Sequence, residues 1–200
     1  MAYETEVKYY IPDLDVMLDM LDDPEIKRTR RRVFERNTRF DDEARTLSER
    51  GIVLRLREDD RIRLTFKEAF PGSPTAYALT RIEFETEVSN FHDMYAILRR
   101  LGYHPFWEYE KFRTTYEFNE TEIVLDELPF GNFIEIEGNT PQEIAFAAIK
   151  LGLMGEKAFK DSYADLFARV KTAMQLNFDD LTFKNFQGIE VPGKIFTSDE

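Results

Sequence analysis

The sequence predicts an α+β domain built on an antiparallel sheet. About eight short segments alternate polar and apolar residues with the period of a strand, and the few helical segments do not separate them in a regular βαβ order. The length of 200 residues suits one domain, with or without a tail. Closing such a sheet into a barrel would remove its exposed edges.

The predicted strands are short and bounded by turn residues. Residues 52–57 (IVLRLR) and 61–68 (RIRLTFKE) alternate clearly, and Asp59-Asp60 between them suits a hairpin turn. Gly and Pro within residues 70–74 predict a loop. The remaining predicted strands cover residues 3–11, 27–39 (from Arg32 onward), 80–88, 109–118, 121–127 and 132–137.

Four helices are predicted from apolar spacing and capping residues. One follows Pro12, and an amphipathic one covers residues 90–101. A third begins at Thr140, which forms a capping box with Glu143, and a fourth begins near residue 161.

The predicted organisation is a domain over residues 1–172 and an extension over residues 173–200. Four phenylalanines make the extension too aromatic for a plain disordered tail: Phe178, Phe183, Phe186 and Phe196. We therefore expect it to pack on the body of the protein or on a partner.

The composition excludes several classes of protein. With 27 basic and 39 acidic residues the formal charge is −12, which argues against bulk binding to nucleic acid or anionic membranes. The absence of cysteine excludes disulfides, cysteine-ligated zinc and a thiol nucleophile, and it fits a cytoplasmic protein. No apolar run reaches the roughly 20 residues of a membrane span, and the acidic first residues predict no signal peptide.

The charge is unevenly distributed along the chain. Residues 27–67 hold 14 basic and 8 acidic side chains, although the chain as a whole is acidic. This basic segment would either pair with the acidic remainder or help to bind an anion.

Charged residues occupy one face of nearly every predicted strand, because side chains at i and i+2 share a face. These faces would either point to solvent around an apolar interior or line a polar tunnel that helices cover on its apolar outside. In a tunnel, the carboxylates would suit Mg²⁺ or Mn²⁺, and the arginines and lysines a phosphate chain. Together they would support metal-assisted phosphoryl or nucleotidyl transfer.

Ordered motifs carry a resemblance to a known family. Glu4-Thr5-Glu6-Val7-Lys8 resembles the ExExK signature of the CYTH superfamily, the triphosphate tunnel metalloenzymes. The supporting residues follow in the family's order over about residues 3–170: Asn37 to Asp41, Gly51 to Arg57, Lys67, Arg81 to Glu85, Lys111 to Arg113, Asp126, Glu135 to Gly138 and Ser162 to Leu166. The superfamily includes class IV adenylate cyclases, thiamine triphosphatases, inorganic triphosphatases and, more distantly, RNA triphosphatases.

The resemblance implies an eight-stranded antiparallel β-barrel tunnel with flanking helices. It implies divalent metal, Mg²⁺ or Mn²⁺, held by acidic residues: Glu4, Glu6, Glu135 and Glu137, with Glu83, Glu85 and Asp126 as further acidic lining. It implies a triphosphate held by basic residues: Lys8, Arg55, Arg57, Lys67, Lys111 and Arg113, with Lys160 as a further cation although Asp161 separates it from Ser162. Lys8 and Arg57 are the predicted catalytic residues.

Three functions remain open at this stage. The first is a triphosphatase acting on inorganic triphosphate or on a small organic triphosphate such as ATP or thiamine triphosphate. The second is a class IV adenylate cyclase, and the third is a non-catalytic module that binds polyphosphate or nucleotide. A second copy of the chain is a candidate partner. Three further residues, His92, His104 and Trp107, are interpreted as structural.

Overall fold

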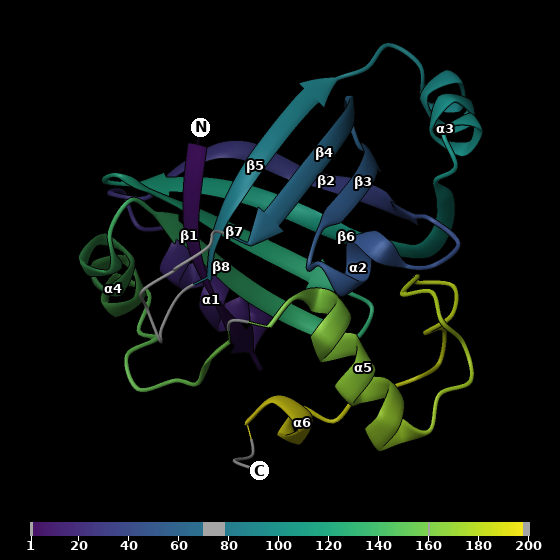
Figure 1. Ribbon diagram of the computed structural model, residues 1–200. Helices are drawn as coiled ribbons and strands as arrows, with labels where there is room; N and C mark the ends of the chain where they lie inside the picture. Colours follow the sequence, from purple (N-terminus) through teal and green to yellow (C-terminus); the bar gives the residue numbers. More distant parts are fainter. Residues whose placement is uncertain (1, 70–78, 160, 198–200) are drawn as a thin grey trace.

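A computed structural model describes residues 2–69, 79–159 and 161–197. It contains one antiparallel sheet of nine strands in the order β5-β4-β3-β2-β6-β7-β8-β1-β9 (Figure 1). The strands are β1 (Ala2–Ile11), β2 (Lys27–Asp41), β3 (Val53–Glu58), β4 (Ile62–Ala69), β5 (Leu79–Glu87), β6 (His104–Phe118), β7 (Thr121–Leu128), β8 (Gly131–Gly138) and β9 (Ala158–Phe159).

Strand β1 joins the two ends of the curled sheet. One edge of β1 pairs with β8, whereas its other edge pairs first with β5, over Ala2–Glu6, and then with β9 at Lys8 and Tyr9. Eight strands, in the order β5-β4-β3-β2-β6-β7-β8-β1, therefore surround a common interior. Strand β9 pairs with the edge of β1 beyond β5.

Helices cover the outside of this barrel (Figure 1). They are α1 (Leu14–Leu21), α2 (Thr46–Glu49), α3 (Phe91–Arg100), α4 (Pro141–Lys150), α5 (Tyr163–Met174) and α6 (Lys194–Thr197). Val7 and Ile11 of β1 pack with Met17 of α1 and Ile144 of α4 in one apolar cluster, while the intervening Lys8 is buried on the opposite face of β1. The charged faces of the strands thus point inward, and the tunnel arrangement is confirmed.

Two further clusters complete the apolar exterior. Helix α3 buries Leu98 against Phe40 and Leu56 of β2 and β3. Helix α5 contributes Leu166 and Phe167 to the largest aromatic cluster, which also holds residues from β6, β8 and the C-terminal segment. The helices bury the apolar outer faces of the strands, so the protein has a hydrophobic core although the interior of the barrel is polar.

The segment from 175 to 197 packs on the body of the protein. Leu181, Phe186 and Phe196 are at most 5% exposed and lie in the same cluster as α5. Tyr109 of β6 and Leu181 form a parallel β-bridge. The division of the chain at residue 172 stays a prediction.

Two strands are longer than their sequence pattern predicts. Strand β2 begins at Lys27 rather than Arg32, and register irregularities near Arg28 and Arg30 obscure its alternation. Strand β6 begins at His104 rather than at Tyr109, and the proline at position 105 obscures the strand pattern there. A further irregularity opposite Phe40 accommodates this proline, since bulges tolerate a residue without an N–H.

Three short elements were not predicted: α2, β9 and α6. Each has only two to four residues, too few for a periodic signal. The capping box at Thr140 and Glu143 is confirmed, and Ser162 with Asp165 forms a second one at the start of α5. The predicted loop at 70–74 lies outside the described residues.

Candidate active site

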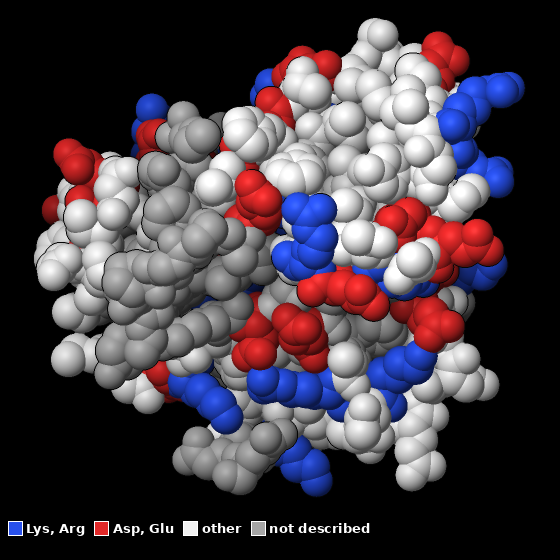
Figure 2. All heavy atoms as spheres, viewed as in Figure 1, with Lys and Arg blue, Asp and Glu red and all other residues white. Residues whose placement is uncertain are grey.

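A cavity of about 300 Å³ opens inside the barrel and receives side chains from most of its strands. Acidic and basic side chains gather around its mouth in the middle of one face of the molecule (Figure 2). The charged lining residues are Glu6, Lys8, Arg39, Arg55, Arg57, Arg63, Lys67, Glu83, Glu85, Lys111, Arg113, Glu122, Glu135 and Glu137. The start of α5 and the rings of Trp107 and Tyr109 complete the wall.

Strand register brings the two acidic motifs together. In the antiparallel pairing of β1 with β8, Glu6 lies opposite Glu137 and Lys8 lies opposite Glu135. Directly opposed residues in such a pair lie on the same face of the sheet. The ExExK motif and the Glu-Ile-Glu motif, almost 130 residues apart in sequence, therefore form one site.

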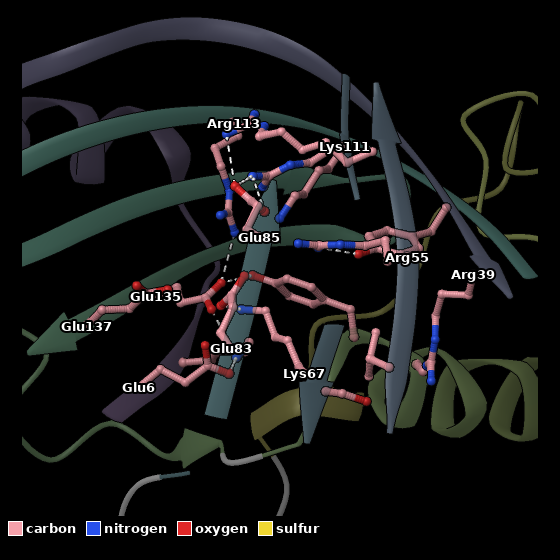
Figure 3. A pocket seen from close by; sticks show the side chains of 18 of the residues that line it. Glu6, Arg39, Arg55, Lys67, Glu83, Glu85, Lys111, Arg113, Glu135 and Glu137 are labelled. Atoms are coloured by element: carbon pink, nitrogen blue, oxygen red, sulfur yellow. Dashed lines mark hydrogen bonds and ion pairs between the residues drawn. The ribbon is translucent and has the colours of Figure 1, made fainter. Parts of the chain in front are cut away.

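Three carboxylates form a compact group at one end of the cavity (Figure 3). One oxygen from each of Glu6, Glu135 and Glu137 lies within 4.8 Å of the others. Lys8 Nζ lies 2.7 Å from Glu6 Oε1 and 3.3 Å from Glu135 Oε1. Lys8 therefore places a positive charge beside both Glu6 and Glu135, which offsets the repulsion between the two carboxylates.

The protonation states follow from burial and from these pairs. Burial alone would raise the pKa of Glu6, but Lys8, a hydrogen bond with Glu135 and the charge of Lys67 together hold that pKa well below its ordinary value. Burial alone would lower the pKa of Lys8, yet Glu135 and Glu6 raise it overall. Glu6 is therefore ionised beside a charged Lys8 at neutral pH.

Strand β6 supplies a basic wall through Lys111 and Arg113. Both bind the fully buried Asp126 of β7, at 3.0 Å and 2.6 Å respectively. Arg113 also reaches Glu135 Oε2 at 3.1 Å. Tyr163, the first residue of α5, donates its hydroxyl to Asp126 at 2.8 Å.

Asp126 was predicted as part of the acidic lining, but it is not among the residues that line the cavity. It lies behind the cavity wall, where it orients Lys111, Arg113 and the hydroxyl of Tyr163. Burial, Asp126 and Glu135 raise the pKa of Tyr163 well above its ordinary value, so the hydroxyl keeps its proton. A direct role of Asp126 as a metal ligand stays a prediction.

Strands β3, β4 and β5 form the opposite wall. Arg57 Nη2 lies 3.1 Å from Glu85 Oε2, and Lys67 pairs with Glu83. Arg55 donates to the hydroxyl of Tyr109 at 2.8 Å. Figure 3 shows Arg55 and Arg39 at the end of the cavity opposite the three carboxylates.

Glu35 of β2 is a buried acid that sequence reasoning missed. It is 1% exposed and faces two cavity cations, with Arg57 Nη1 at 3.3 Å and Lys111 Nζ at 3.6 Å. Asn37 Nδ2 donates to Glu35 Oε1, the oxygen that faces Lys111, at 2.9 Å. Burial alone would raise the pKa of Glu35, but Lys111, Arg113 and Arg57 hold it well below its usual range.

Most of the predicted site residues line the cavity. They are Glu6, Lys8, Arg55, Arg57, Lys67, Glu83, Glu85, Lys111, Arg113, Glu135 and Glu137. The side chain of Glu4 and the whole of Lys160 lie outside the described residues. The roles assigned to individual residues stay predictions.

Several lining residues were not among the predicted site residues: Arg39, Arg63, Glu122, Tyr109 and Trp107. Strand parity was the available signal, since Tyr109 and Trp107 share the face of Lys111, and Glu122 shares that of Asp126. Trp107 is 9% exposed and packs in the aromatic cluster, as its interpretation as a packing residue predicts, and it lines the cavity as well. Neither His92 nor His104 is among the residues that line the cavity.

The fold and site together define a protein with a charged tunnel inside an antiparallel barrel. A family model of the CYTH domain matches residues 2–161. The chain therefore belongs to the CYTH family.

Solved structures with this fold come from distant organisms. A candidate adenylate cyclase from Vibrio parahaemolyticus is 23% identical, with a TM-score of 0.71 over 83% of this chain and 98% of that one. A protein from Pyrococcus horikoshii is 24% identical, with a TM-score of 0.65 over 82% and 98% of the two chains. A candidate adenylyl cyclase from Hippeastrum is 19% identical, with a TM-score of 0.59 over 86% and 96%.

The search of curated proteins returned no match. In the described parts of the chain, no helix combines the length and apolar character needed to cross a membrane.

Proposed function

We propose that this protein is a divalent-metal-dependent triphosphatase that hydrolyses inorganic triphosphate or a small organic triphosphate. The observation that carries the proposal is the joint presence, in one cavity, of the Glu6, Glu135 and Glu137 group and of a row of lysines and arginines. Carboxylates alone would suit a cation, and basic residues alone would suit an anion. Their close arrangement suits a metal–phosphate complex.

The carboxylate group fits a hard divalent cation. Mg²⁺ and Mn²⁺ prefer oxygen ligands, and three carboxylates whose oxygens converge within 4.8 Å offer them. Such a cation supplies positive charge against the phosphate oxygens and promotes ionisation of an attacking water.

The basic residues would bind and orient the phosphate chain. Lys8 lies beside the carboxylates, while Arg113, Lys111 and Arg57 line the next part of the cavity. Each of these cations is already oriented by a buried acid, namely Glu135, Asp126 or Glu35. Such preorganised charge stabilises the negative charge that a transferring phosphoryl group carries, without reorganisation during the reaction.

Cyclisation of ATP to cyclic AMP is the second candidate. The structural likeness to a candidate adenylate cyclase from Vibrio parahaemolyticus favours it. A dominant triphosphatase activity is described for the Hippeastrum protein of similar fold, which supports hydrolysis as the first candidate. In both reactions the same residues would hold the triphosphate, and the attacking group would differ.

A product analysis separates the candidates. The purified protein would be incubated with tripolyphosphate or ATP, with and without Mg²⁺ or Mn²⁺, and the products separated by chromatography. We expect metal-dependent release of orthophosphate. Cyclic AMP as the main product would replace the proposal with the cyclase, and binding without turnover would indicate a non-catalytic module.

A matched pair of variants tests the site itself. Glu137→Gln removes one member of the carboxylate group, whereas Glu117→Gln changes an exposed acid on β6. We expect the first variant to lose roughly 10²-fold or more in kcat and the second to keep wild-type activity. Full activity of Glu137→Gln would contradict the assignment of the carboxylate group.

A further inference from the structure

The first half of β6 contributes residues to the cavity although it does not pair with β7. The pairing of β6 with β7 runs from Phe112 to Phe118. Tyr109 and Lys111 precede this range, and both line the cavity. On the other edge of β6, Trp107 to Lys111 pair with β2 in regular register.

The C-terminal segment occupies the edge of β6 that β7 leaves. Leu181 N donates to Glu108 O and Glu110 N donates to Leu181 O, each at 2.9 Å. The side chain of Asp180 accepts from Glu108 N at 2.9 Å, and the side chain of Glu110 accepts from Phe183 N at 2.9 Å. Residues 180–183 therefore act as a short parallel edge strand, held by two main-chain and two side-chain hydrogen bonds.

The residue between these anchored positions is Tyr109. Tyr109 is 7% exposed, its ring stacks on Trp107 at 4.7 Å between ring centroids, and its hydroxyl accepts a hydrogen bond from Arg55 at 2.8 Å. Since Glu108 and Glu110 are fixed by residues 180–183, the backbone of Tyr109 is fixed as well. A continuous set of contacts thus leads from Asp180 to the guanidinium of Arg55.

We propose that residues 180–183 position Tyr109, and through it Arg55, for binding of the triphosphate. Asp180 is then a positioning residue outside the cavity, and the C-terminal segment contributes to substrate binding by fixing the backbone of β6. This inference rests on the proposed function for its substrate, whereas the placement of Tyr109 can be measured without any substrate.

The test compares variants of the full chain. Asp180→Ala removes the acceptor for Glu108 N, Asp180→Asn keeps an oxygen acceptor, and Lys184→Ala changes an exposed residue of the same segment. Tyr109→Phe removes the contact with Arg55 directly. Glu110→Ala, which removes the acceptor for Phe183 N, replaces Asp180→Ala if that variant does not fold.

We expect Asp180→Ala to raise KM for tripolyphosphate severalfold, to roughly tenfold at most, with a smaller change in kcat. Asp180→Asn should restore the KM, and Lys184→Ala should match the wild type. The double variant with Tyr109→Phe should be no worse than the more affected single variant, because both act on the same contact.

A second readout needs no activity. Trp107 is the only tryptophan in the chain and stacks on Tyr109, so its fluorescence reports the position of this segment. We expect Asp180→Ala, and neither Asp180→Asn nor Lys184→Ala, to shift the emission.

Two results would overturn the inference: an Asp180→Ala variant with wild-type KM and emission, or KM effects that multiply in the double variant. If the wild type neither binds nor hydrolyses tripolyphosphate, the proposed function fails, and the emission of the Asp180 variants alone decides whether the segment positions Tyr109.

Discussion

Replacing Glu35 by glutamine should destabilise the protein strongly, although the change removes only one charge. Glu35 is 1% exposed and faces Arg57 and Lys111 at 3.3 Å and 3.6 Å. Breaking a buried ion pair by removing one partner costs about 3–5 kcal/mol. Arg57 keeps Glu85 and Lys111 keeps Asp126, so we expect a loss near the lower limit, about 3 kcal/mol.

The assay is thermal or urea-induced unfolding, followed by circular dichroism at several pH values. A loss of about 3 kcal/mol corresponds to a fall in Tm of roughly 6–12 °C for a domain of this size. Glu58→Gln on β3 is the control, because it changes an exposed acid and should shift stability by about 0.5 kcal/mol or less.

The pH dependence has a defined sign. The pKa of Glu35 in the folded protein lies well below its ordinary value of 4.5, so its ionised form is stabilised by folding. That contribution is complete above pH 4.5 and is lost as the pH falls toward the folded-state pKa. The difference between wild type and Glu35→Gln should therefore narrow below pH 4.5. Equal stabilities at pH 7, or a difference that widens in acid, would refute this reasoning.

Three further predictions concern metal, a hydroxyl and a helix cap. Mg²⁺ or Mn²⁺ should raise the Tm of the wild type but leave the Tm of Glu137→Gln nearly unchanged, because a metal ion bound to the native carboxylate group stabilises the folded protein. Equal shifts of Tm in both proteins, measured by differential scanning fluorimetry, would count against that metal site. Tyr163→Phe should cost about 1–3 kcal/mol in urea unfolding, because Asp126 loses a donor at 2.8 Å, and an unchanged midpoint would contradict this contact. Thr140→Ala should cost about 1 kcal/mol by removing the capping box of α4, whereas the exposed Gln142→Ala should cost much less, and equal losses in thermal unfolding would argue against the cap.

Strand periodicity predicted which residues share a face of each strand, because side-chain alternation is a local property of the backbone. The family resemblance, and not the periodicity, predicted that the charged faces line the interior. Glu6, Lys8, Glu135 and Glu137 could be identified from sequence, since their motifs carry a family resemblance and the register of β1 with β8 brings them together. The side chain of Glu4 and the residue Lys160 lie outside the described part of the chain and remain predictions.

The features that sequence reasoning missed depend on partners distant in the chain. Glu35 shares a strand face with Asn37 and Arg39, but it lies in a basic stretch. Its partners, Arg57 and Lys111, come from two other strands, so its ion pairs could not be predicted from the pattern of β2 alone. Strand β9 and helix α6 have two and four residues, and tertiary contacts rather than propensity specify them. The pairing of Leu181 with β6 has no sequence signal either, because a single parallel bridge needs no periodicity.

The double pairing of β1 has a consequence for how the chain folds. Its partners are β5, β8 and β9, all of which lie far along the sequence, and the last of them ends at Phe159. Strand β1 therefore pairs only with strands that are much further along the chain, and contacts between residues so far apart in sequence slow folding. We expect the barrel to be completed in a late, cooperative step, with the unpaired edge of β1 as the segment most exposed to misassembly until then.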